Sequence, residues 1–542
     1  MSTSTACEQF FDIPELPRLL TAFLNRKDVS RLARTNRKLN SLCTPSLYWS
    51  LERSFDKESK IWESLPALLA LARNVQHNPG LTLLDLTSVP LLDLRGGRMF
   101  ARTLAGLSKL KNLSLTIHCR NGDWIELWNY LFFRFPSSIQ GLLLNIEACE
   151  GLLLNIEACE GLSRYQDALN EVVHAGGWKG AEVEAIDERQ EPLIHLESMF
   201  FLGSQGYQWD MTKDLCAMFA HCPNLKMLNG SINVADGGRI EALGHFIAEG
   251  CPKIEELTFG VVEYDERLPI RIMSSLPAQQ VVKVDLRIGS PRFGMSAVNL
   301  AIHQHSTTLR VLLIEGRTDV IWFSVATILK ECLNLEILRL PCKKPQGLVI
   351  SLDDVLEHPW ACSKLKRLAL AIGGCEIPYE SDVEPYYRRP TPITLDEVET
   401  EHLSRLEDLY KRIGSLTALE ELDLKMVPLD EDGEVDYDAL EHDRMLFPAM
   451  LNLPDPRTGM PGFLHHLAGL EKLKGIRGSV WADIDEAVRT IDWMEVTWMD
   501  RHWPLLRYAT VYPMYGEMSA PFKWLRERRA DGKQDLWLEG IP

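Results

Sequence analysis

The acidic segment from Asp430 to Glu441 has the carboxylate spacing of a calcium-binding loop. Acidic residues occupy its first, third, fifth, seventh, ninth and twelfth positions. Calcium takes oxygen ligands at such a spacing, but the sharp turn of the loop requires glycine at the sixth position, where this chain has Val435. A predicted strand, and not a helix, precedes the segment. We therefore expect a solvated acidic loop and no calcium site.

His303 and His305 stand two residues apart in a stretch with helical patterning. Residues at i and i+2 of a helix point to different sides, so we expect both rings to be solvated and not to bind one ion. The twelve cysteines are scattered, without a C-x-x-C pair or the cysteine and histidine clusters of a RING-type zinc module. We expect no metal and no other cofactor.

The short motifs of common catalytic sites do not occur in the sequence. It lacks the glycine-rich phosphate loop, the nucleophile elbow of hydrolases and the paired-histidine helix of zinc proteases. We therefore expect a protein that is not an enzyme. Catalysis by the tryptophan-rich C-terminal end remains an alternative, and that end holds Trp481, Trp493, Trp498, Trp503, Trp524 and Trp537.

The composition is that of an ordinary folded protein with an acidic surface. Hydrophobic residues make up 46% of the 542 residues, and the formal net charge is −18. An acidic chain is poorly suited to phosphate contacts, so we expect no nucleic-acid partner. The sequence has no apolar stretch of about 18 residues that could span a bilayer, and its first residues lack the pattern of a secretory signal. We expect a protein of the cytoplasm or nucleus, without membrane association.

A leucine pattern recurs along most of the chain. The structural units that it predicts must position the acidic segment, the histidines and the tryptophans described above. In its clearest copy, Leu335, Leu338 and Leu340 are spaced so that a short strand directs all three into a core. Successive copies are 26 residues apart from Leu312 to Leu338 and 30 residues apart from Leu338 to Leu368. A unit of this length cannot bury its apolar face alone, so the units must stack. The middle residues of the copies are Leu84, Leu113, Leu228, Leu257, Val284, Leu312, Leu338, Leu368 and Leu422.

Amphipathic segments lie between the predicted strands. Ile240, Leu243 and Ile247, for example, share one helical face. One strand and one helix per unit predict an α/β horseshoe with a parallel sheet on its concave side. The pattern resembles the leucine-rich repeat in its intracellular form, with turns such as Cys222-Pro-Asn-Leu and Cys251-Pro-Lys-Ile. The fold expected is a leucine-rich-repeat solenoid.

Some features depart from a regular repeat. That family ladders its turns with Asn or Cys at the ninth position, where only Asn233 fits, so we expect the turns to be held in another way. Inserts at 163–192, 375–400 and 427–461 break the period, and we expect solvated loops or binding loops there. One decamer occurs twice, at 141–150 and 151–160. We expect one copy to be a strand and the other a lengthened strand or an insertion, unless the duplication is a gene-model error.

Residues 12–51 predict a separate small helical unit. Asp12 and Glu15 have the spacing of a reciprocal N-cap, and apolar residues follow at helical spacing. The stretch resembles an F-box. The matching segments are Ile13-Pro14-Glu15-Leu16, the helix with Leu19, Leu20, Phe23 and Leu24, the steps Asp28-Val29 and Leu32-Ala33, and Pro45-x-Leu47-Tyr48-Trp49. The chain departs from the family at Asn36-Arg37-Lys38-Leu39, which replaces a Cys-x-x-Trp, and Trp49 stands one place late.

The resemblance implies the substrate-recognition subunit of an SCF-type ubiquitin ligase. The F-box would bind a Skp-type adaptor, and through it cullin, while the repeats hold an unknown target protein. An alternative is a scaffold that binds partners without directing their degradation. An unrelated helical cap on the solenoid is the alternative to the F-box itself. The expected adaptor-binding residues are Ile13, Pro14, Leu16, Leu19, Leu20, Phe23, Leu24, Val29 and Leu32.

The predicted domain order has four parts. An F-box (1–51) is followed by a linker helix (52–80), the repeat solenoid with its inserts (81–478) and a Trp-rich cap (479–542). Along each predicted strand, the residue between the last two leucines points outward, onto the concave sheet. We hypothesise that a mixed-charge group on this face selects the target. Its residues are Asp285, Arg287, Glu315, Arg339 and Arg367. The alternative is that these residues only keep the sheet soluble.

Overall fold

The computed structural model describes part of the chain, which divides into two compact units, 1–254 and 255–542. Short pieces between residues 28 and 52 are described. The further described residues lie, with small gaps, in 83–90, 104–119, 131–148, 191–203, 218–231, 237–262, 267–288, 295–316, 324–340, 349–375, 395–427, 447–481, 491–512, 520–530 and 537–539.

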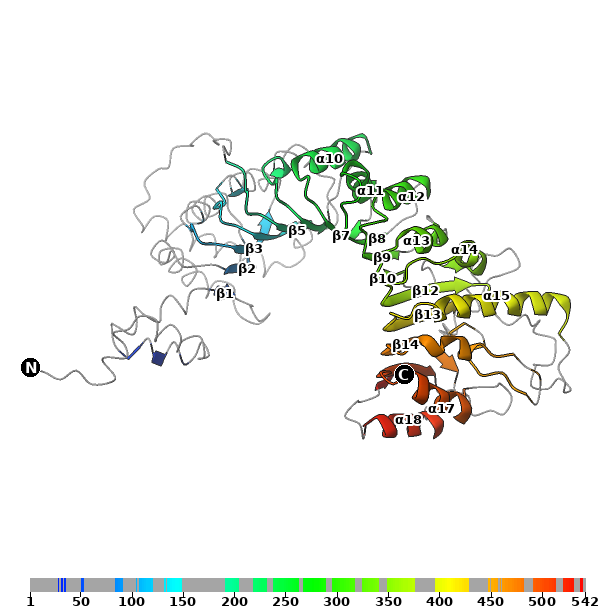
Figure 1. Cartoon of the computed structure of the whole chain (residues 1–542). Coiled ribbons are helices and arrows are strands. Elements are labelled where there is room, and N and C mark those ends of the chain that lie inside the picture. The colour runs from blue at the N-terminus through cyan, green and yellow to red at the C-terminus, as the bar shows by residue number, and fades with distance from the viewer. Residues whose placement is uncertain are drawn as a thin grey trace, which may run out of the picture. The chain divides into compact units, whose positions relative to one another are not determined.

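The first unit is built on parallel strands that pair in chain order, coloured blue to green in Figure 1. The strands are β1 (Ser50–Glu52), β2 (Leu83–Pro90), β3 (Asn112–Cys119), β4 (Gly141–Ala148), β5 (Ser198–Gly203) and β6 (Met227–Ser231). Helix α10 (Gly237–Gly250) follows them. The first copy of the duplicated decamer forms β4, whereas the second copy lies outside the described residues. β5 was not among the strands predicted from the leucine pattern, because its core residue is Met199 in a Phe-rich stretch.

The second unit has the same construction. Its strands are β7 (Glu256–Val262), β8 (Lys283–Ile288), β9 (Val311–Gly316), β10 (Ile337–Arg339), β11 (Ile350–Ser351), β12 (Arg367–Gly373), β13 (Glu421–Val427), β14 (Gly475–Trp481), β15 (Tyr508–Tyr512) and β16 (Trp537–Glu539). They pair in parallel and in chain order, except that β10 pairs with β12 directly and β11 pairs only with β12. The predicted leucine-rich-repeat solenoid with a parallel sheet is therefore confirmed.

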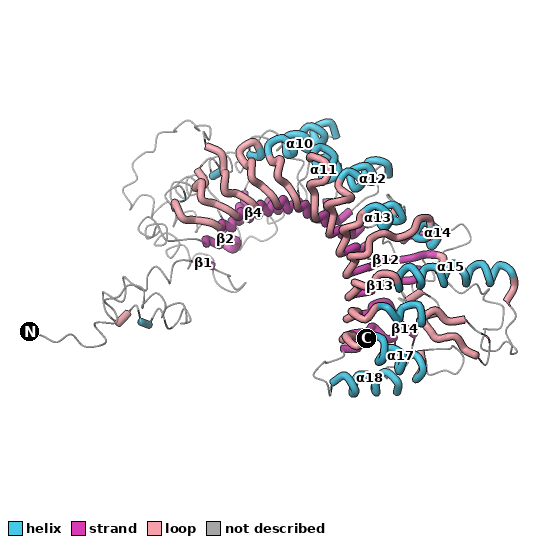
Figure 2. Tube along the Cα trace, in the orientation of Figure 1, coloured by secondary structure: helices cyan, strands magenta, loops and turns pink. Residues whose placement is uncertain are grey.

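Helices follow most strands of the second unit and lie along one face of its sheet (Figures 1 and 2). They are α11 (Arg267–Ser275), α12 (Met295–Gln304), α13 (Val325–Glu331), α14 (Leu352–Leu356), α15 (Glu397–Gly414), the 3₁₀ helix η4 (Leu464–Gly469), α17 (Trp493–His502) and α18 (Ala520–Ala530). No described helix covers the other face of this sheet, which we call the open face (Figure 2).

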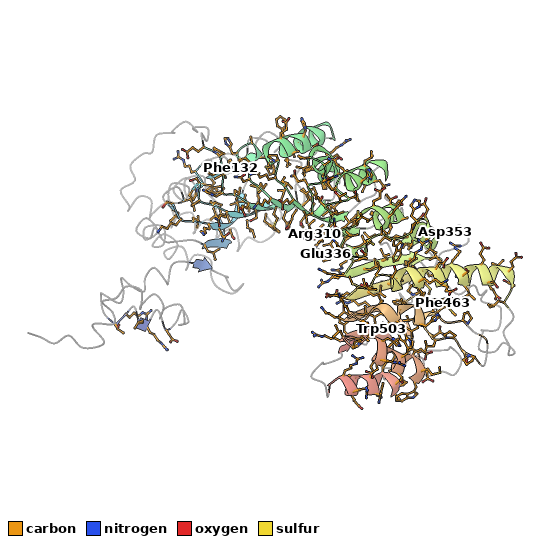
Figure 3. All side chains as sticks on the ribbon, in the orientation of Figure 1. Phe132, Arg310, Glu336, Asp353, Phe463 and Trp503 are labelled. Atoms are coloured by element: carbon orange, nitrogen blue, oxygen red, sulfur yellow. The ribbon has the colours of Figure 1, made fainter. Side chains whose placement is uncertain are left out.

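The leucines of each repeat form the core between the sheet and the helices. Leu335, Leu338 and Leu340 are fully buried, each with 0% exposure. The turn before the strand is fixed by the hydrogen bond from Leu335 N to Cys332 O, 3.0 Å. Backbone bonds then join the repeats, with Arg310 O accepting from the amides of Glu336 and Ile337 at the start of β10. Figure 3 shows Arg310 beside Glu336 at this junction.

Buried cysteines pack beneath successive turns, and partly exposed asparagines link the turns by hydrogen bonds. These residues take the place of the ninth-position ladder, where the sequence offered only Asn233. Cys332 and Cys362 are fully buried one repeat apart, and burial raises the pKa of their thiols to about 12 and about 11. The Asn334 amide donates to Thr307 O in the preceding turn at 2.6 Å and accepts from Lys364 in the next at 2.7 Å. Asn233 lies outside the described residues.

Helix α15 begins within the predicted insert 375–400. Asp396 caps it, accepting from Glu399 N at 2.7 Å while the Glu399 side chain accepts from Asp396 N at 3.0 Å. Tyr410 of this helix is fully buried, donates to Pro448 O at 3.0 Å and packs 5.8 Å from the ring of Phe463. The larger part of the insert, residues 376–394, is outside the described residues, as is the whole acidic segment from Asp430 to Glu441.

The sheet continues into the Trp-rich end. β15 and β16 add strands beyond residue 479, and α17 opens with a second reciprocal N-cap between Asp492 and Glu495. Trp503, labelled in Figure 3, is fully buried and donates to Leu467 O at 3.1 Å. The end predicted as a cap thus contains further strand-and-helix units, and its described residues place Trp503 in the core.

The expectation that His303 and His305 are both solvated is wrong. Helix α12 ends at Gln304, so His305 lies in the turn that follows and points inward, with 0% exposure. His305 Nε2 lies 3.0 Å from Met273 O, and Nδ1 faces the amide of Gln280 at 3.3 Å. These neighbours fix the neutral ring with its proton on Nε2. His303 is exposed and contacts Glu331 at 2.5 Å.

Candidate functional site

The open face of the second unit carries the side chains that alternate with the core leucines. In β10, Leu338 is buried between Leu312 of β9 and Leu368 of β12, whereas Arg339 is only partly buried and points to the opposite side. The register aligns the corresponding residues of neighbouring strands in one row across the sheet. We call it the central row, and its members are Thr258, Asp285, Leu313, Arg339, Ala369, Asp423 and Arg477.

Three of the predicted target-binding residues form one group on β8 and β9. Asp285 lies in the central row, and Arg287 follows it on the same strand. Arg287 Nε lies 3.8 Å from Glu315 Oε2 on β9. Burial raises the pKa of the Asp285 carboxyl, and the cations Arg287 and Lys283 oppose that shift. The structure therefore brings together Asp285, Arg287 and Glu315, as the sequence predicted.

The other two predicted residues differ in their surroundings. Arg339 stands in the central row beyond Leu313, and it makes no ion pair with the described part of the chain. Arg367 aligns with Ile337 and Glu421 in the row one residue earlier. Its guanidinium lies 3.4 Å from the Glu421 carboxylate, so a neighbouring strand already balances its charge. Arg339 is the more available of the two arginines for a charged ligand.

Asp423 of β13 is the most unusual side chain of the central row. One of its carboxylate oxygens, Oδ1, is buried and has no hydrogen-bond partner among the described residues. Burial is the main cause that raises the pKa of this carboxyl, against the opposing fields of Lys425, Arg477 and Arg339. A buried acceptor without a donor costs free energy, and such groups in native proteins call for an explanation.

Arg477 and Tyr508 complete this region, and sequence reasoning missed both. The Arg477 guanidinium lies 5.0 Å from the centroid of the Tyr508 ring. The Tyr508 ring lies against the backbone of Gly475, in the space that a Cβ atom there would occupy. Burial raises the pKa of the Tyr508 hydroxyl, helped by the field of Glu421. The sequence signal of β15 was weak because Ala509 stands where the pattern has a larger apolar residue such as Leu422.

The predicted adaptor-binding residues lie outside the described residues, with one exception. Leu32 is described, and its carbonyl accepts from Thr35 N at 3.1 Å and from the Thr35 hydroxyl at 2.7 Å. Nearby, Arg31 contacts Asp28 at 3.2 Å. These contacts are local turn contacts, and the adaptor-binding role of the segment stays a prediction.

The described residues hold no group of three histidine, cysteine or acidic side chains placed to bind a metal. In the same part of the chain, every helix is too short or too polar to cross a membrane. What the open face offers chemically is a set of fixed charges and hydrogen-bonding groups on a rigid sheet, which can bind a polar segment of another molecule.

Comparisons with known proteins place the chain only loosely. No protein-family model matches it, and no curated protein was found as a relative. Among solved structures, it is similar to the Rad7 and Elc1 complex of yeast, at 12% identity and a TM-score of 0.30, over 100% of this chain and 99% of that one. It is also similar to the leucine-rich repeat-containing protein LegL7 from Legionella pneumophila, at 9% identity and a TM-score of 0.27, over 71% and 92% of the two chains.

Proposed function

We propose that this protein is the substrate-recognition subunit of an SCF-type ubiquitin ligase. The F-box-like segment would bind a Skp-type adaptor and so connect to cullin, and the repeats would hold a target protein. The ubiquitin chemistry would belong to other subunits. This chain would contribute by raising the effective concentration of a target lysine near the charged ubiquitin.

The target-binding part of this proposal is supported by the arrangement of charged side chains on the open face. It combines a regular, rigid register with arginines at Arg339 and Arg477 that have no ion pair among the described residues. On a surface that serves solubility alone, we expect each charge to be balanced by a neighbouring residue. Lys366 and Glu336 form such a pair, 2.6 Å apart at the strand start. Support for the adaptor-binding part comes from the sequence pattern between Ile13 and Trp49.

Adaptor binding can be tested by co-purification from cells with the proteasome blocked. Leu20→Asp places a charge on the apolar face of the predicted first helix, where burial of each leucine is worth about 1.5–3 kcal/mol. It should abolish capture of the Skp-type adaptor while circular dichroism shows the solenoid still folded. Lys27→Asp, a charge change between the predicted helix that holds Leu19, Leu20, Phe23 and Leu24 and the Asp28-Val29 step, is the control and should retain capture.

The same purification separates the two candidate functions. Recovery of adaptor and cullin together supports the ligase subunit. Stable partners recovered without cullin support the alternative, a non-degradative scaffold built on the same repeats. Adaptor capture that survives Leu20→Asp would contradict the F-box assignment.

A further inference from the structure

Two cations of the central row flank a carboxylate oxygen that has no donor among the described residues. From Arg339 the row runs through Ala369 and Asp423 to Arg477, so Arg339 and Arg477 are three strand steps apart. Asp423 is mostly buried but keeps some exposed surface on the open face, although its Oδ1 atom is buried. A carboxylate turns readily about its last torsion, and such a turn would bring Oδ1 within reach of a ligand on that face. Ala369, which is small and buried (3% exposed), lies between Asp423 and Arg339 along the row.

The local charge favours an anionic ligand. Glu421 is balanced by Arg367 at 3.4 Å. Arg477 is held against the Tyr508 ring, and neither Arg477 nor Arg339 makes an ion pair among the described residues. Asp423 is then the one carboxylate between these two arginines along the row. On a chain whose formal net charge is −18, this is a place where negative side chains of a partner would be attracted.

The spacing of the row fits an extended polypeptide that crosses the strands. Three strand steps of about 4.8 Å separate Arg339 from Arg477 by about 14 Å, and four residues of an extended chain span nearly the same distance. Side chains at i, i+2 and i+4 of such a segment face the same side. With residue i over Arg339 and residue i+4 over Arg477, residue i+2 lies between Ala369 and Asp423.

Resting on the proposed function, we propose that Arg339, Asp423 and Arg477 form the receptor site for an extended acidic segment of the target protein. Acidic side chains at i and i+4 pair with the two arginines. A hydrogen-bond donor at i+2, such as a serine hydroxyl, supplies the bond that Asp423 Oδ1 does not receive from the described residues. The Tyr508 ring, seated on Gly475, holds Arg477 in position for this contact.

Fluorescein-labelled peptides and the full chain test this site directly. The probes carry two glutamates separated by one, three or five residues in a threonine-rich background that favours extended backbone, with serine or alanine at the central position. Anisotropy at low ionic strength should show the tightest binding for the probe with three intervening residues and a central serine. Equal binding of all three spacings would overturn the proposal, because charge attraction alone predicts it.

Variants of the chain assign the contacts. Arg339→Gln and Arg477→Gln should each weaken the best probe about tenfold, the usual loss for one charge-assisted hydrogen bond. Arg526→Gln, the same charge change at an exposed site of α18, is the matched control and should leave binding unchanged. If either central-row variant binds the probe as tightly as the unmodified chain, the site is wrong.

Asp423 is tested through the central residue of the probe. Asp423→Asn should weaken the serine probe severalfold and leave the alanine probe nearly unchanged, because the coupling exists only when both partners are present. Equal effects on the two probes would remove Asp423 from the site. Adaptor capture is measured on the same variants. Probe binding without adaptor capture would leave this site standing while the ligase function fails.

Discussion

The ring of Tyr508 fills the space that a side chain at position 475 would need. A Cβ atom on Gly475 would lie 1.9 Å from Tyr508 Cζ and 2.4 Å from its hydroxyl oxygen. The two residues face each other on β14 and β15, and the Arg477 guanidinium also lies near the ring. The Tyr508 ring can therefore take this position only because residue 475 is a glycine. The position of the Arg477 side chain depends on the ring in turn.

This relationship predicts a coupled pair of substitutions. Gly475→Ala should destabilise the chain by about 1–3 kcal/mol, the usual cost of overpacking, or displace the Tyr508 ring. In a Tyr508→Ala background the same change should cost little, because the obstructing ring is gone. Melting temperatures of the two single variants and the double variant measure the coupling. A full additive loss in the double variant would show that the ring is not the obstacle.

The strand register predicts opposite sensitivities at two neighbouring residues of β10. Leu338 is fully buried, so Leu338→Ala should cost about 2–5 kcal/mol by creating a cavity. Arg339 points to the open face, and Arg339→Ala should stay within about half a kcal/mol. Denaturant unfolding of the two variants compares them. Similar losses at both positions would contradict the register.

His305 predicts a weakening of the fold in acid. Burial lowers its pKa from 6.5, so the folded state resists the proton that the unfolded chain takes up. Above about pH 6.5 the ring is neutral in both the folded and the unfolded chain, so its burial costs no ionisation free energy. Below about pH 6.5 the unfolded chain takes up a proton first, so the free energy of unfolding falls as the pH drops towards the lower folded-state pKa. His305→Gln removes this titration. Its melting temperature should fall less between pH 8 and pH 5 than that of the unmodified chain, while parallel declines would contradict the prediction.

Asp423 predicts a gain in stability from loss of its charge. The pKa of the Asp423 carboxyl is higher in the folded state than in the unfolded chain, where it is 3.8. The protonated carboxyl therefore stabilises the fold below pH 3.8, and this stabilisation is lost as the pH rises through the folded-state pKa. At neutral pH, Asp423→Asn should therefore raise the melting temperature, and this gain should shrink as the pH falls towards 4. Glu471→Gln, at an exposed acid in the turn before β14, should change the melting temperature little. A lower melting temperature for Asp423→Asn would show that the carboxylate stabilises the fold.

The repeating unit follows from the order of the residues alone, because the period of the leucines fixes both the strand and the side of the strand that is buried. This period is enough to assign Leu338 and Arg339 to opposite faces of the sheet. It also predicts Asp285, Arg287 and Glu315 as neighbours, since residues at equal repeat positions align when the units stack.

The packing of one repeat against the next decides two further features. It decides which charges are balanced, and it decides where strands continue the repeat without leucines. Arg339 and Arg367 look alike in the sequence, but they align with different residues of the next strand. Arg367 lies beside Glu421, whereas Arg339 lies beside Ala369 and has no ion pair among the described residues. His305 turns inward because α12 ends one residue before it, which a helical periodicity does not show. Arg477 and Tyr508 join the site because a glycine accepts a ring from the next strand, and such a fit is set by contacts between repeats and not by the order of residues within one.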